Sequence, residues 1–218
     1  MGADRLDEQI VEFAALIADP LVDAFSTAID QVEQDSRRYP HDKYPALRPM
    51  LMRAALRETL EIRELPEGTR LAGRPQQNCQ LLIAHNDFVF RVLKENRQLF
   101  ENGIPVAGRN LARRAFYRQT SFDNLLEIQN PLLQPPINLI LLWDWKNILA
   151  RQEGVDLRLV HPLAPGNFHG KSVPVDLSIP VVSDASFYTD LRFETDEDAL
   201  DFFAAEIAKE EQDETDAG

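Results

Sequence analysis

The architecture of this chain follows from residues 131–146, which read PLLQPPINLILLWDWK. A helix cannot continue through Pro135-Pro136, because proline lacks a backbone N–H and clashes with the preceding turn. From Ile137 to Trp145, both alternating sets of side chains are mostly apolar. A strand with this pattern is covered on both faces, so the segment predicts a central β-strand on which the rest of the chain packs.

The chain before this strand is patterned for helices. Between Asp4 and Gln34, apolar residues recur at intervals of three and four, the spacing of one helical face. Pro20 interrupts this pattern and indicates either two helices or one kinked helix. The same spacing predicts further helices over residues 45–62, 77–102, 106–119 and 121–128. We therefore expect a helical region from residue 1 to residue 130.

The chain after the strand is predicted to complete a small, mainly antiparallel sheet. Strands are expected over residues 156–162, 172–179 and 187–193, and the acidic residues from Thr195 onward begin a final helix. Residues 212–218 are too polar to pack, which is typical of a disordered tail. The expected fold class is α+β: a helical half over 1–130, then a sheet with a C-terminal helix over 131–211, either as two regions or as one continuous domain.

Composition and charge limit the classes of function. The 218 residues carry a formal net charge of −13, which repels nucleic acid in bulk and favours a basic partner. No apolar run approaches the roughly 20 residues that cross a bilayer, and the first residues lack the pattern of a signal peptide. The single cysteine, Cys79, agrees with a reducing compartment. We therefore expect a cytoplasmic protein with no membrane partner.

One segment opposes the overall charge. Between Ile104 and Ser121 there is no acidic residue, and four arginines fall inside this interval. On a helical projection, Leu111, Ala112, Ala115 and Phe116 form an apolar arc that packs on the protein, while the arginines and a tyrosine point outward. The candidate binding residues are Arg109, Arg113, Arg114, Tyr117 and Arg118.

Three interpretations of these arginines are open. They pair with acids of the chain itself, they dock an acidic protein partner or an anionic ligand, or they contact DNA. The third follows from an outline similar to a helix-turn-helix, in which a helix ends near residues 101–105 and a basic helix follows over residues 106–119. Four arginines in a protein of net charge −13 make a small electrostatic footprint for DNA.

A candidate for catalysis lies at the end of the predicted central strand. Asp144 and Lys146 are two residues apart and therefore on one face of that strand. The pair resembles the second half of the PD-(D/E)xK motif of metal-dependent nucleases. That resemblance implies a divalent metal held by carboxylates and a lysine that helps to activate water. The upstream acid of the motif would be Asp123 or Glu127.

The sequence favours a non-catalytic function, because it carries no complete catalytic set. We expect a cytoplasmic regulatory or interaction protein that binds another protein, as antitoxins, immunity proteins and complex subunits do, and that needs no cofactor. There are two alternatives. One is a metal-dependent nuclease that uses Asp144 and Lys146, and the other is a DNA-binding protein that uses residues 106–119.

Overall fold

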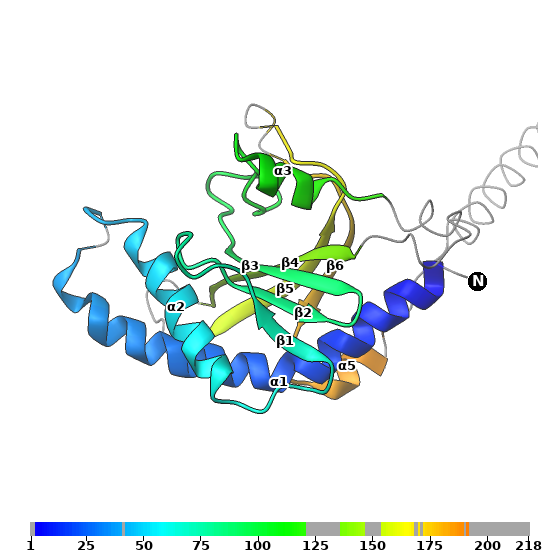
Figure 1. The fold of residues 1–218 in the computed structure, drawn as a ribbon, viewed down its shortest axis with the longest axis horizontal. Helices are drawn as coiled ribbons and strands as arrows, with labels where there is room; N and C mark the ends of the chain where they lie inside the picture. Colours follow the sequence, from blue (N-terminus) through cyan, green and yellow to red (C-terminus); the bar gives the residue numbers. More distant parts are fainter. Residues whose placement is uncertain are drawn as a thin grey trace, which may run out of the picture.

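The computed structural model describes residues 3–40, 42–120, 136–146, 154–167, 170, 172–189 and 191. These residues form a six-stranded sheet in the order β1-β2-β3-β4-β5-β6, in which neighbours are antiparallel except for the parallel pair β3 and β4. Figure 1 shows the sheet at the centre, with α1 on one side and α3 on the other. The α+β class and the mainly antiparallel sheet are confirmed. The helices are α1 (Ala3–Asp35), a short 3-10 helix (Ser36–Arg38), α2 (Leu47–Glu61), α3 (Leu111–Tyr117) and α5 (Ala185–Thr189), and the strands are β1 (Thr69–Ala72), β2 (Leu82–His85), β3 (Phe88–Lys94), β4 (Ile137–Trp145), β5 (Val155–Pro162) and β6 (Val175–Val181).

The first helix, α1, is continuous over 33 residues and contains Pro20. Of the two arrangements expected from the sequence, a single helix is therefore the one that forms. Its buried side chains recur every three or four residues, which makes one face apolar. This face shares an apolar core with α2 and with one face of the sheet, through residues such as Ile10, Ile17, Leu21 and Phe25.

The central strand, β4, is covered on both faces, as the sequence predicts. Leu139, Leu141 and Trp143 are buried in the core that contains α1 and α2. Ile140 and Leu142 are buried in a second core on the opposite face, which includes residues of the segment 104–107 and of α3. This second core holds α3 against the sheet and so positions the site described below.

The helix expected over residues 77–102 is wrong. This part of the chain contains the β2–β3 hairpin, whose two-residue turn is Asn86-Asp87. Asn86 has a φ of 48°, the left-handed conformation that such turns use and that asparagine tolerates. The apolar residues fit both a helical and a strand spacing, and pairing of β3 with the distant β4 selects the strand. The sheet therefore begins at Thr69, well before the central strand.

The strand expected over residues 187–193 is wrong for residues 187–189, which lie inside the short helix α5, while residues 190, 192 and 193 lie outside the described residues. Oδ1 of Asp184 accepts hydrogen bonds from the backbone N–H of Ser186 at 3.0 Å and from its hydroxyl at 2.6 Å. A side-chain acceptor at this place stabilises the start of a helix. Residues 121–128, the terminal helix expected from Thr195 and the acidic tail over 212–218 lie outside the described residues.

Candidate functional site

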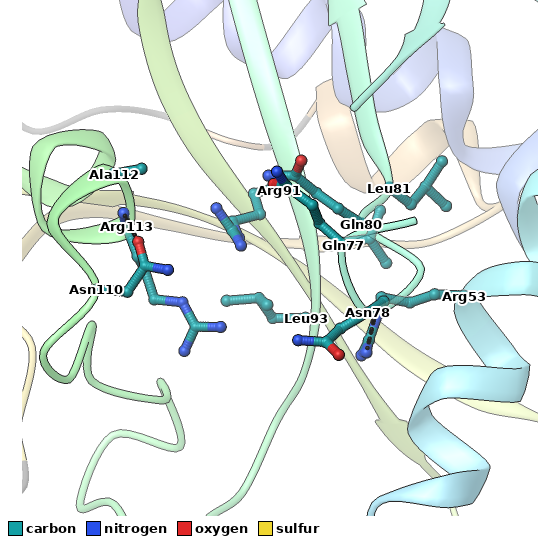
Figure 2. Close-up of a pocket in the computed structure, with 11 residues that line it drawn as sticks. Arg53, Gln77, Asn78, Gln80, Leu81, Arg91, Leu93, Asn110, Ala112 and Arg113 are labelled. Atoms are coloured by element: carbon teal, nitrogen blue, oxygen red, sulfur yellow. Dashed lines mark hydrogen bonds between the residues drawn. The ribbon is translucent and has the colours of Figure 1, made fainter. Parts of the chain in front are cut away.

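A cavity of about 150 Å³ lies between α3, β3 and the loop that leads into β2. Its polar lining consists of arginines and side-chain amides, which Figure 2 shows converging from separate elements. Among the described residues no carboxylate lines this arginine pocket, although the chain as a whole carries a net charge of −13. The arginines are Arg53 from α2, Arg91 from β3 and Arg113 from α3, and the amides are Gln77, Asn78, Gln80 and Asn110.

Arg53 anchors the loop that carries three of the amides. Its Nε donates to the carbonyl oxygen of Cys79 at 3.2 Å, and its Nη2 donates to the carbonyl oxygen of Asn78 at 3.0 Å. Asn78 and Cys79 have φ values of 54° and 53°, in the left-handed region that residues other than glycine seldom adopt. The two hydrogen bonds from Arg53 therefore hold a loop conformation that is costly by itself.

Arg91 reaches the pocket because of the alternation of side chains along β3. Phe90 and Val92 point into the core that contains α1, so Arg91 between them projects from the opposite face. Its guanidinium carbon lies 5.8 Å from the centroid of the Phe116 ring, which is a cation–π contact. No carboxylate in the described part of the chain forms an ion pair with Arg91.

Arg113 is placed by the start of α3. The side chain of Asn110 accepts a hydrogen bond from the backbone N–H of Arg113 at 2.9 Å, which is an N-cap. In Figure 2 the side chain of Arg113 extends away from α3 toward the opposite wall of the pocket. Its Nε is buried and has no hydrogen-bond partner within the residues described. A buried donor without a partner costs free energy, whereas the two terminal nitrogens of the same guanidinium are not buried in this way and can meet an acceptor supplied by a ligand.

The three guanidinium groups are close enough to influence one another. Burial lowers the pKa of Arg53 and the pKa of Arg91, and the positive charge of Arg113 lowers both further. Cys79 opposes the lowering of the Arg53 pKa, and Tyr117 opposes that of Arg91. Because arginine stays protonated in proteins, the pocket concentrates three like charges whose repulsion an anion would reduce.

The third helix packs through a different face from the one expected. Tyr117, which the helical projection places outward, is fully buried, and its hydroxyl donates to the carbonyl oxygen of Pro105 at 2.6 Å. Burial raises the pKa of Tyr117 to about 12. Leu111, expected in the packed arc, is 82% exposed. The projection over residues 106–119 assigned the wrong packing face, because Tyr117 and not Leu111 is buried in the second core.

Of the four arginines that the sequence singles out, Arg113 lines the pocket and the others do not. Arg109 and Arg118 are exposed and Arg114 is half-buried. Sequence reasoning missed two further arginines, Arg53 and Arg91. Each lies in an ordinary amphipathic or alternating segment, and the fold alone brings them to Arg113, so no local signal marks them.

Asp144 is an ion-pair partner and not part of a carboxylate cluster in the described residues. Its Oδ1 accepts a hydrogen bond from Nζ of Lys94 at 2.8 Å and another from the next backbone N–H at 2.9 Å. Lys146 is exposed. Within the described ranges, no group of three or more His, Cys, Asp or Glu side chains is placed to hold a metal ion. Outside those ranges lie the acids expected to complete the nuclease motif, Asp123 and Glu127.

The helix-turn-helix outline is wrong for this chain. Its first helix would end near residues 101–105, but the structure has β3 followed by turns there. The following helix, α3, is also only 7 residues long. The basic segment is therefore one wall of the arginine pocket, and in the described chain no helix lies over residues 95–110, directly before α3.

No protein-family model, curated protein or solved structure matches this chain. The interpretation of the site therefore depends on its own geometry. No helix in the described residues is both long enough and apolar enough to span a membrane.

Proposed function

We propose that this protein is a non-catalytic binding protein whose arginine pocket holds a phosphate or carboxylate group of its ligand. One observation carries the proposal: Arg53, Arg91 and Arg113 gather in a cavity whose described lining contains no acid. This positive charge is concentrated in a chain of net charge −13. Arginine is the side chain suited to planar, bidentate recognition of carboxylate and phosphate.

The donors of the pocket fit an oxyanion. Each guanidinium carries five N–H donors in a fixed fork, and Arg53 directs two of its nitrogens at the backbone. The side chains of Arg91 and Arg113 form no hydrogen bond with another described residue. The amides of Gln80 and Asn110 add further polar groups at the same cavity. An anion with two or three oxygen atoms would accept from several of these donors at once.

The volume of the pocket limits what can enter it. Sites that enclose a drug-sized ligand measure about 300–1,000 Å³, whereas this cavity measures about 150 Å³. The cavity therefore admits one anionic group and leaves the remainder of a larger ligand outside.

The lining favours recognition over catalysis. General acid–base catalysis needs a side chain whose pKa lies near the working pH. The described lining consists of arginines, amides and aliphatic side chains, which do not exchange protons readily near neutral pH. These side chains are suited to hold an anion and not to transfer a proton to it.

Replacing Arg113 by glutamine is expected to change the free energy of unfolding by no more than about 0.5 kcal/mol. Arg113 has no ion-pair partner among the described residues, and its removal relieves repulsion with Arg53 and Arg91. Arg158, by contrast, donates to the buried Glu95 at 2.6 Å, so its replacement should lower the free energy of unfolding more. Urea unfolding of Arg113→Gln and of Arg158→Gln measures the loss in free energy of unfolding for each variant. Equal losses in the two variants would assign Arg113 to the framework of the fold.

Inorganic phosphate is expected to raise the Tm of the protein in a saturable way. A ligand that binds only the folded state stabilises it by RT ln(1 + [L]/Kd), which is about 2.7 kcal/mol at a concentration one hundredfold above Kd. Sodium chloride at the same ionic strength should produce a smaller shift, because screening alone provides no bidentate contact. Acetate, tested in the same way, shows whether a carboxylate is accepted as well.

Three variants decide whether this response comes from the arginine pocket. Arg91→Gln and Arg113→Gln should each remove the saturable part of the phosphate response, because each removes a donor from the lining. Arg109→Gln is the matched control, since Arg109 is exposed and lies outside the lining. A phosphate response that is the same in all three variants would overturn the proposal.

A further inference from the structure

The surface next to the arginine pocket is both apolar and basic. Leu111 lies between Asn110 and Ala112, two residues that line the pocket, and its side chain is 82% exposed. The neighbouring residues on the outer side of α3 are exposed as well. We call this surface the α3 rim and define it by Arg109, Leu111, Ala112, Ala115 and Arg118.

We propose that the anionic group in the arginine pocket is presented by an acidic segment of a partner protein, with an aliphatic side chain of that segment packed on Leu111. This inference rests on the proposed function and names its ligand class. The cavity of about 150 Å³ holds little beyond the anionic group, so the adjoining part of the ligand lies on the rim. At the rim it meets an exposed leucine, whose burial is favourable only for an apolar neighbour.

The charge of the α3 rim fits an acidic partner. Arg109 and Arg118 are exposed, and neither forms an ion pair with a carboxylate in the described ranges. The sequence contains no acid between Ile104 and Ser121, whereas the whole chain has a net charge of −13. An acidic segment is therefore attracted at this rim and repelled by much of the remaining surface, which directs it to the pocket.

The opposite side of the pocket fits a polypeptide backbone. Gln77 and Asn78 are exposed there, on the loop that faces α3 across the pocket in Figure 2. A side-chain amide both donates and accepts hydrogen bonds, so the two amides can pair with the N–H and C=O groups of an extended chain. A free inorganic anion would use the arginines but would leave Leu111 and these amides without a role.

Two pools of fluorescent synthetic peptides test this inference. Both pools carry a central glutamate or phosphoserine among aspartates. In the first pool the remaining flanking positions are leucine, isoleucine and valine, and in the second they are serine, glycine and asparagine. Fluorescence anisotropy at fixed salt should show the first pool binding about tenfold more tightly, the effect of burying one large aliphatic side chain. Equal affinity for the two pools would overturn the inference.

Matched variants show whether Leu111 provides the contact. Leu111→Ser should weaken binding of the first pool about tenfold and leave the phosphate response unchanged, because Leu111 borders the cavity without lining it. Ile62→Ser is the control, since Ile62 is 86% exposed and lies at the end of α2 outside the lining. Both replaced side chains are exposed, so the fold should be retained in each variant. A Leu111→Ser variant that binds the first pool as the wild type does would contradict the inference.

Failure of the inference and failure of the proposed function give different results. If phosphate raises the Tm through Arg91 and Arg113 but neither pool binds, the pocket holds a free anion and the partner segment is wrong. If neither phosphate nor either pool responds to the arginine substitutions, the proposed function is wrong as well. Tighter binding of random-sequence duplex DNA than of both pools, at the same salt concentration, would replace the acidic partner by nucleic acid.

Discussion

A Trp143→Ala variant is expected to have a free energy of unfolding about 3–5 kcal/mol lower than that of the wild type. Trp143 is 1% exposed in the middle of the sheet. The centroid of its ring lies 5.9 Å from that of Phe25 in α1 and 5.5 Å from that of Trp145. Alanine removes the aromatic contact between the central strand and the long helix. It also leaves a cavity that closely packed neighbours cannot fill without strain.

Trp143→Phe is the matched control for this prediction. The indole N–H of Trp143 is buried and has no acceptor among the described residues, so phenylalanine removes an unsatisfied donor and keeps an aromatic ring beside Phe25. Its loss in free energy of unfolding should therefore be clearly smaller. Urea unfolding monitored by circular dichroism gives both values. Equal losses for the two variants would mean that the aromatic contact with α1 contributes little.

Replacing Glu95 by alanine is expected to lower the free energy of unfolding by about 3 kcal/mol, the low end for breaking a buried ion pair. Glu95 follows β3 directly, is 4% exposed, and accepts from Arg158 at 2.6 Å and from Arg97 at 3.0 Å. Without the carboxylate, the partly buried guanidinium of Arg158 loses its counter-charge. The loss is kept to the low end because Arg158 still donates to the carbonyl oxygen of Asn102 at 2.7 Å.

Glu61→Ala provides the comparison for Glu95→Ala. Glu61 also pairs with an arginine, Arg57 at 2.8 Å, but half of its side chain is exposed. Exposed pairs within one helix contribute only about 0.3–0.5 kcal/mol, so this variant should unfold almost as the wild type does. A double variant, Glu95→Ala with Arg158→Met, should lose less than the sum of the single losses, because the second change removes the uncompensated charge. Additive losses would show that the two side chains are not coupled.

The central strand could be predicted from the sequence, and the hairpin before it could not. Ile137–Trp145 is apolar on both alternating sets, and the two proline residues before it exclude a helix. The segment over residues 77–102 places apolar residues at spacings that suit a helix as well as two strands. The deciding interaction is the pairing of β3 with β4, which is remote in sequence. The local sign of the hairpin was the Asn86-Asp87 turn, where asparagine adopts the left-handed conformation.

The candidate site could be predicted only in part for the same reason. The acid-free interval pointed to Arg113, because charge composition is a local property of the sequence. Arg53 and Arg91 lie on other elements and reach the pocket through the packing of α2 and the register of β3. Tyr117 was placed outward because the arc that contains Leu111 was expected to pack, whereas Tyr117 is the side chain that is buried in the second core. The face of a short helix that packs is decided by the surface that it meets, which the sequence of the helix alone does not specify.

The parallel pairing of β3 with β4 has a consequence for how the protein can diversify. Parallel neighbours cannot be joined by a tight turn and need a long crossover, and here the crossover from β3 to β4 carries α3 with Asn110 and Arg113. The exposed residues of such a connection, here Arg109, Leu111 and Ala112, accept exchanges more readily than the strands that it joins. Substitutions at these exposed residues can therefore alter the proposed ligand preference without disturbing the hydrogen bonds between the strands.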